Sequence, residues 1–106
     1  MKALTKTQKQ WREDVRALGS ILSGLHPVEI HHCAGRTAVH DKVHVGHWWI
    51  LPLTSEEHAK YVPEWGKRRK FMEKTLFGAV CKLIVRRGGV LPFGDDVATA
   101  IQEYRR

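Results

Sequence analysis

The sequence predicts a small single domain of the α+β class, in which a ββα unit at about residues 28–65 is flanked by helices. Its 106 residues are enough for one modest core and too few for two. Apolar residues recur at helical spacing near both ends of the chain, while the middle contains two short runs typical of strands. Helices packed around a minimal sheet are therefore expected.

The first helix is expected to follow Thr5 or Thr7, because either hydroxyl can cap a helix N-terminus. Gly19 and Gly24 bracket the segment that supplies its stop signals. Its apolar positions recur every three or four residues and should face the core: Trp11, Val15, Leu18 and Leu22.

Two strands are expected next. The His26–Pro27 pair favours an extended backbone and leads into a short alternating strand at residues 28–31. After a loop, the apolar run at 48–51 predicts a second strand, which Pro52 ends.

A helix should begin directly after the second strand. Thr54 and Glu57 have the spacing of a capping box, which places His58 in the first helical turn. The C-terminal helices are expected at about 67–104. The longer of them spans 67–85, and a final short one is capped by Asp95 or Asp96. The longer helix should turn its apolar residues inward: Phe71, Leu76, Val80 and Leu83.

Charge favours a polyanionic partner. Eighteen Lys and Arg stand against eleven Asp and Glu, a formal net charge of +7. Four consecutive cations form one run that is a candidate for nucleic-acid binding: Lys67, Arg68, Arg69 and Lys70. The alternative is that these cations are solvated helix faces. No apolar run approaches the roughly 20 residues that span a bilayer, and the N-terminal residues lack a secretory signal, so a cytoplasmic protein without membrane contact is expected.

The two cysteines form no recognisable metal motif. Cys33 and Cys81 are far apart in the sequence, and no CxxC is present. Two free thiols are expected, with a disulfide between them as the alternative.

Six of the seven histidines lie within residues 28–58. His31 ends the first predicted strand and His58 begins the predicted helix, so both can bind one divalent cation if these ends meet. Neighbouring side chains on a strand point to opposite sides, so His32 would be left to take a proton from water. A metal and a general base suffice to hydrolyse a phosphodiester. The alternative is a polar loop rich in histidine.

The order EIHH, GH, an apolar run, LPL and EEH resembles the ββα-metal, or HNH, endonucleases. More narrowly, about residues 4–84 resemble the RecA-dependent HNH-type nucleases of phages and prophages, the recombination-enhancement family. The resemblance implies DNA as the substrate, one divalent ion (Mg²⁺, with Zn²⁺ or Mn²⁺ as alternatives) and no small-molecule cofactor. It also suggests a RecA filament as a partner, in the cytoplasm of a bacterial host.

Carried over residue by residue, the resemblance makes His31 and His58 metal ligands and His32 the general base. His47 matches the polar residue that braces the loop between the strands, or contacts metal or phosphate instead. Arg36 follows the catalytic pair and is expected to stabilise charge on the scissile phosphate.

The departures from the family concern its metals. Three positions where relatives carry the cysteines of a structural zinc read Ser20, Ser23 and Thr54, so that zinc is expected to be absent and the turn to be held by packing and hydrogen bonds. Glu57 and Val62 replace further family histidines or ligands. The third ligand of the catalytic metal stays open among His44, Asp41, Glu57 and water. A non-catalytic DNA-binding accessory of recombination, on a degenerate HNH fold, is the alternative function.

Overall fold

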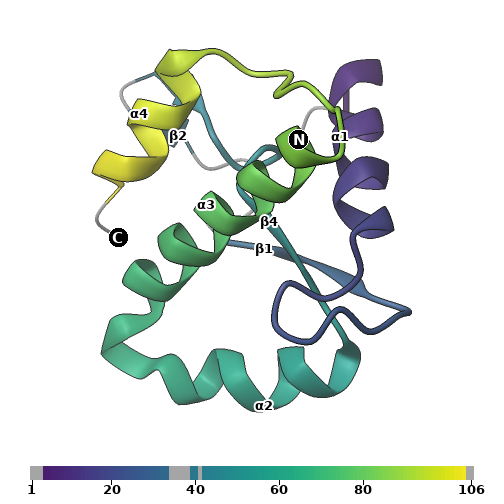
Figure 1. The fold of residues 1–106 in the computed structure, drawn as a ribbon. Coiled ribbons are helices and arrows are strands. Elements are labelled where there is room, and N and C mark those ends of the chain that lie inside the picture. Colours follow the sequence, from purple (N-terminus) through teal and green to yellow (C-terminus); the bar gives the residue numbers. More distant parts are fainter. Residues whose placement is uncertain (1–3, 34–38, 41, 105–106) are drawn as a thin grey trace.

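The computed structural model describes residues 4–33, 39–40 and 42–104. In this part of the chain, four α-helices and a 3-10 helix surround two small antiparallel strand pairs (Figure 1). The predicted α+β class is confirmed. In chain order the elements are α1 (Lys6–Ala17), β1 (Glu29–His32), β2 (Val39–His40), β3 (Val43–His44), β4 (Ile50–Leu53), α2 (Ser55–Trp65), η1 (Gly66–Arg68), α3 (Arg69–Arg86) and α4 (Asp95–Glu103).

The central pair consists of β1 and β4, with His31 opposite Leu51. Pro52 lies inside β4 opposite Ile30, so the expectation that it ends the strand is wrong. Proline is tolerated because β4 has a single strand neighbour, and its outer edge needs no N–H donor. The carbonyl of Pro52 instead accepts a hydrogen bond from the Ile21 N–H at 3.0 Å. The β2–β3 pair was not expected from the sequence.

The core lies where α1 and α3 pack against β4 (Figure 1). Trp11, Trp49 and Leu51 are fully buried there. The indole N–H of Trp11 donates to the carbonyl of Trp48 at 3.0 Å, so the largest core side chain of α1 also leaves no polar atom unsatisfied. This contact fixes α1 against the segment that leads into β4.

Helix α1 begins as the sequence predicts. Thr5 caps it and forms a reciprocal capping box with Gln8. The helix ends at Ala17, and Gly19 then adopts a left-handed conformation with φ of +77°. A Cβ on Gly19 would lie 2.7 Å from the Gly24 carbonyl oxygen, so glycine is required at this reversal. Leu22 therefore lies beyond the helix and is 41% exposed, not on its core face.

The inward face of α3 differs from the expected one. Phe71 is 60% exposed, and Leu76 and Leu83 only border the core. The buried positions of the helix are Glu73, Phe77, Val80 and Ile84. The charged Glu73 lies on this face because it is paired with His31 of β1 and Arg69 of its own helix. A prediction based on apolar residues alone does not identify such a pair.

Helix α4 is capped by the backbone of Gly94 and by no side chain, so the predicted aspartate cap is wrong. Asp95 and Asp96 occupy its first turn, where negative charge interacts favourably with the helix dipole. Among the described residues, none of the helices combines the length and apolarity needed to cross a bilayer.

The turn after α1 is fastened to the start of α2 by Glu57. Its carboxylate accepts a hydrogen bond from the Ser20 hydroxyl at 2.5 Å and one from the Thr54 N–H at 2.8 Å. The Ser20 oxygen in turn accepts bonds from the Leu22 and Ser23 N–H groups. Ser20 and Ser23 of this turn and the distant Thr54 are therefore linked through one carboxylate.

We expect the Glu57 contribution to stability to depend on pH. Burial raises the pKa of Glu57, but hydrogen bonds from Ser20, Ser23 and Thr54 outweigh it and lower the pKa. A group with a lowered folded pKa stabilises above its unfolded pKa of about 4.3 and loses this effect as pH falls through the folded value. In urea unfolding, Glu57→Gln should therefore be less stable than wild type by about 1 kcal/mol at pH 6–7. The gap should close below about pH 4.

The exposed Glu64 of the same helix offers a matched control. Glu64→Gln should change the free energy of unfolding little at either pH. A Glu57→Gln gap that persists unchanged at pH 3 would mean that the network does not depend on the charge.

Candidate metal centre at the junction of β1 and α2

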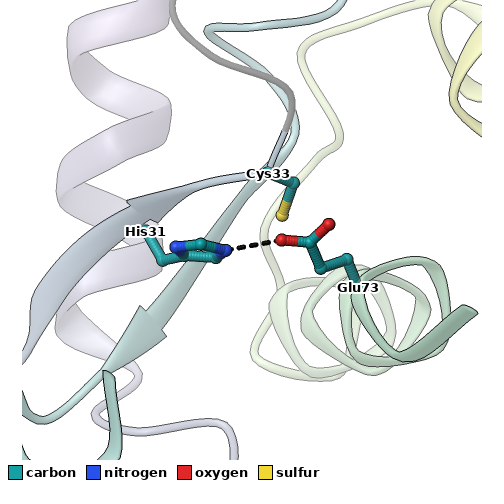
Figure 2. A group of neighbouring side chains, drawn as sticks. All are labelled: His31, Cys33 and Glu73. Atoms are coloured by element: carbon teal, nitrogen blue, oxygen red, sulfur yellow. Dashed lines mark hydrogen bonds and ion pairs between the residues drawn. The ribbon is translucent and has the colours of Figure 1, made fainter. Parts of the chain in front are cut away.

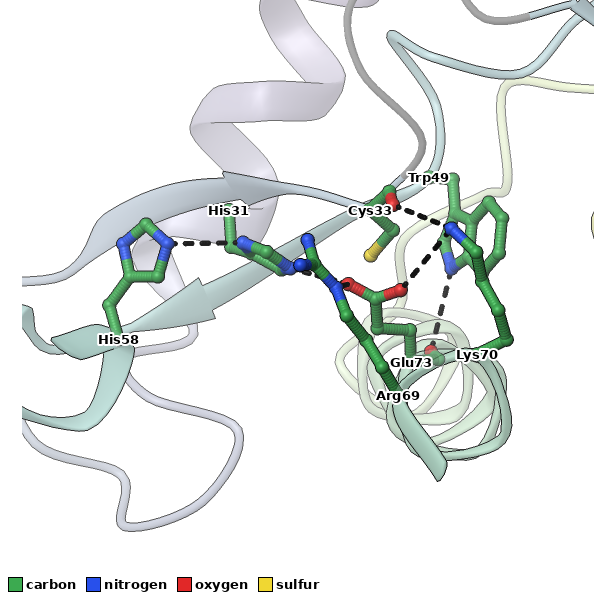
Figure 3. A network of polar contacts seen from close by, with 7 residues as sticks. All are labelled: His31, Cys33, Trp49, His58, Arg69, Lys70 and Glu73. Carbon is green, nitrogen blue, oxygen red and sulfur yellow. Dashed lines mark hydrogen bonds and ion pairs between the residues drawn. The ribbon is translucent and has the colours of Figure 1, made fainter. Parts of the chain in front are cut away.

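His31 and His58 meet at the junction of β1 and α2. Nδ1 of the buried His31 lies 3.1 Å from Nε2 of His58, and the two ring planes are inclined at 69° (Figure 3). His31 is placed by the pairing of β1 with β4, where it lies opposite Leu51, and His58 by the capping box that starts α2. The side chain of His58 is 36% exposed, so the pair has one buried and one solvent-facing member.

The outer nitrogen of each ring faces a carboxylate. Nε2 of His31 lies 2.6 Å from Oε2 of Glu73, and Nδ1 of His58 lies 3.0 Å from Oε1 of Glu29. A carboxylate accepts hydrogen bonds, so we assign the ring protons to these two outer nitrogens. The two inner nitrogens then present lone pairs to each other, an arrangement that a proton or a metal cation between them relieves.

This donor set fits a divalent cation. Two nitrogen ligands about 2.0–2.1 Å from one ion are about 3.3 Å apart in tetrahedral and about 2.9 Å apart in octahedral geometry, and 3.1 Å lies between these values. Metal-binding histidines usually donate their other N–H to a carboxylate, which fixes the ring and makes it a stronger ligand. His31 and His58 both have such a carboxylate.

Glu73 is the centre of a buried network that the sequence did not reveal. Oε2 accepts a hydrogen bond from Nε of Arg69 at 3.2 Å, and Nζ of Lys70 lies 4.0 Å from Oε1. Lys70 also donates to the carbonyl of Cys33 at 3.4 Å and lies over the rings of Trp49 and Tyr104. Two of the four cations proposed to bind DNA are therefore turned towards a buried carboxylate (Figure 3).

A signal for Glu73 exists in the sequence. It follows Arg69 by four residues, the spacing of a helical ion pair, and it interrupts an otherwise apolar face of α3. Glu29 gives no comparable signal, because its partner lies 29 residues away on another element.

Both cysteines are free, as expected. Burial raises the pKa of the Cys33 thiol well above its usual value, and the charge of Glu73 raises it further, against smaller opposite effects of Lys70 and Arg69. Burial also raises the pKa of Cys81, to about 11. Neither thiol is a thiolate near neutral pH, so neither is an activated nucleophile.

The structure describes four more of the predicted site residues, and two others lie outside the described residues. His32 ends β1 and is half-buried, and alternation along the strand directs it away from His31. His47 is half-buried in the turn before β4. His44 is exposed in β3, and Glu57 is bound by Ser20 and Thr54. Arg36 and Asp41 lie outside the residues that the structure describes.

The cations of the predicted DNA-binding run differ in their surroundings. Lys67 and Arg68 are exposed in η1, and the Arg68 guanidinium lies 5.5 Å from the centre of the Phe71 ring. The Arg69 side chain is 44% exposed, so it reaches from the buried Glu73 to the surface. Lys70 is more enclosed.

Comparison with known proteins adds no family assignment: no family model matches the chain, and neither the curated proteins nor the solved structures searched give a match.

Proposed function

We propose that the chain is a metal-dependent DNA endonuclease of the HNH type, hydrolysing phosphodiester bonds during phage or prophage recombination. The observation that supports this most is the convergence of Nδ1 of His31 and Nε2 of His58, each ring with its other nitrogen on a carboxylate. The strand–strand–helix order around this pair is the one that the sequence resemblance implies.

In this proposal, Nδ1 of His31 and Nε2 of His58 hold one divalent cation between the two rings. The cation, when bound, supplies Lewis-acid stabilisation of the charge that develops on the phosphate. Glu73 and Glu29 keep the two rings in the tautomers that leave the inner nitrogens unprotonated. In this proposal, water and substrate oxygens supply the further ligands, because Glu57 is bound by Ser20 and Thr54 and His44 is exposed in β3, which packs against α4.

His32 is the proposed general base. An imidazole titrates near neutral pH, so it can accept a proton from the attacking water. Because it is the next residue after His31, its backbone is adjacent to that of a proposed ligand, and its place on the other face of the strand keeps it from being a ligand itself.

The basic residues at the start of α3 are proposed to hold the DNA backbone. Lys67 and Arg68 are exposed and free to contact phosphates, which gives affinity without base readout. We propose that Arg69 contacts the phosphate nearest the cation, because its guanidinium spans from Glu73 to solvent.

The test is incubation of the purified chain with single- and double-stranded DNA in the presence of Mg²⁺, Mn²⁺ or Zn²⁺, with and without a RecA filament on the DNA. Mg²⁺ is the ion expected from the sequence, but imidazole nitrogens bind Mn²⁺ and Zn²⁺ better, so all three are needed. We expect cleavage that stops on chelation by EDTA. Salt-sensitive DNA binding without cleavage under any condition would instead support the non-catalytic recombination accessory.

A further inference from the structure

His31 has a second set of neighbours on its buried side. Its Nε2, the Sγ of Cys33 and a carboxylate oxygen of Glu73 all lie within 4.8 Å of one another, and all three residues are buried (Figure 2). Two of them come from β1 and its end, and Glu73 comes from α3. Nitrogen, sulfur and carboxylate oxygen are the three ligand types that zinc sites use.

One oxygen of this group lacks a hydrogen bond. Oε2 of Glu73 accepts from His31 and Arg69, whereas Oε1 has no hydrogen-bond partner among the described residues although Glu73 is completely buried. The nearest charge to it is the Lys70 ammonium at 4.0 Å. A buried carboxylate oxygen without a hydrogen bond is costly, and a cation bound to it would remove that cost.

We propose that His31, Cys33 and Glu73 form a binding site for a thiophilic divalent cation of the Zn²⁺ class, separate from the His31–His58 pair and mutually exclusive with it. Only the consequence for catalysis rests on the proposed function; the binding does not. Mg²⁺ would avoid this site, because thiolate ligands select soft cations.

Mutual exclusion follows from the single imidazole that both sites share. A cation on Nε2 of His31 displaces the proton from that nitrogen, and the ring stays neutral by carrying it on Nδ1. The Nδ1–H then donates to Nε2 of His58 across the existing 3.1 Å. Neither Nδ1 of His31 nor Nε2 of His58 then has a free lone pair, so no cation binds between the two rings.

The charges balance within the cluster. Cys33 releases its thiol proton to solvent on binding, and one thiolate with one carboxylate neutralises the dication. Arg69 and Lys70 face the same carboxylate and weaken binding by repulsion. Arg69 is half-exposed and can turn to solvent, while Lys70 is held 4.0 Å away by the Cys33 carbonyl and two aromatic rings.

The binding test uses Co²⁺ as a spectroscopic substitute for Zn²⁺, in anaerobic buffer with the full chain. A thiolate bound to Co²⁺ gives a charge-transfer absorption in the near ultraviolet. We expect this band in wild type and in Cys81→Ser, and its loss in Cys33→Ser, whose folding is checked by circular dichroism. No band in wild type, or an equal band in Cys33→Ser, would overturn the proposal.

Two further readouts distinguish the site at His31, Cys33 and Glu73 from the His31–His58 pair. His58→Ala should keep the charge-transfer band, because His58 is not a ligand of the Cys33 site. Loss of the band in this variant would contradict the existence of two distinct sites. Calorimetry should give one Co²⁺ per chain in wild type, and two would refute mutual exclusion. If the chain cleaves DNA with Mg²⁺ or Mn²⁺, Zn²⁺ should inhibit it, and Cys33→Ser should raise the inhibiting concentration at least tenfold. If the chain has no nuclease activity, the absorption measurement alone decides whether Cys33 binds the cation.

Discussion

Substitution of His32 by alanine is expected to lower the rate of DNA cleavage by about 10²–10⁴-fold, the usual contribution of a general base. The loss should appear in the chemical step, measured as single-turnover cleavage at saturating Mn²⁺. Binding of Mn²⁺ should be unchanged, because His32 is directed to the other side of β1 from His31. A higher pH should partly restore the rate, since hydroxide replaces the missing base.

His44→Ala is the matched control. His44 is an exposed histidine in β3, so its removal changes the same number of imidazoles without touching the β1–α2 junction. We expect wild-type cleavage from it. If His32→Ala also cleaves at the wild-type rate, another group takes the proton and the assignment of the base is wrong.

Local signals in the sequence predicted the elements around the site. Thr5 and Thr54 both cap helices through reciprocal boxes with residues three positions on, and all the atoms involved lie within one turn. The Thr54 box fixes where α2 begins and hence where His58 lies. The end of β1 was predicted within one residue, which left His31 able to meet His58 if the strand end and the helix start were adjacent.

Long-range contacts account for what the sequence did not predict. Pro52 continues a strand because its carbonyl, not its missing N–H, has a partner, in the turn at Ile21. Phe71 was expected inside because it is apolar, but the register of α3 follows Glu73, whose partner His31 is 42 residues away. Ser20 reaches Glu57 across 37 residues, and no pattern in either segment identifies the other.

The carboxylates of the candidate site are also placed by long-range contacts that the sequence does not reveal. The contacts with Glu29 and Glu73 are the basis for assigning the ring proton of each histidine, and the proposed cation site depends on that assignment. Histidine spacing identifies the rings but not their tautomers, because these depend on residues brought together only by the fold.

Glu73→Gln is expected to lower both metal affinity and stability. The substitution keeps the volume and removes the negative charge, leaving Arg69 and Lys70 without their buried counter-ion. Because Arg69 is half-exposed and water can replace its partner, the loss is expected to be about 1–3 kcal/mol, which should appear as a lower free energy of unfolding in urea. His31 becomes a weaker ligand, so affinity for Mn²⁺ should fall by about 10–100-fold.

The Mn²⁺ affinity of Glu73→Gln distinguishes a role of Glu73 in positioning His31 from a purely structural role. Measured by electron paramagnetic resonance at a temperature where the variant is folded, it should be unaffected if Glu73 only stabilises the fold. Glu103→Gln, at an exposed carboxylate of α4, should change neither quantity. Because Mn²⁺ prefers oxygen and nitrogen ligands to thiolate, this measurement reports binding at the His31–His58 pair and not at the site that contains Cys33. Unchanged Mn²⁺ affinity together with the loss of stability would make Glu73 a folding residue and remove its proposed role in orienting His31.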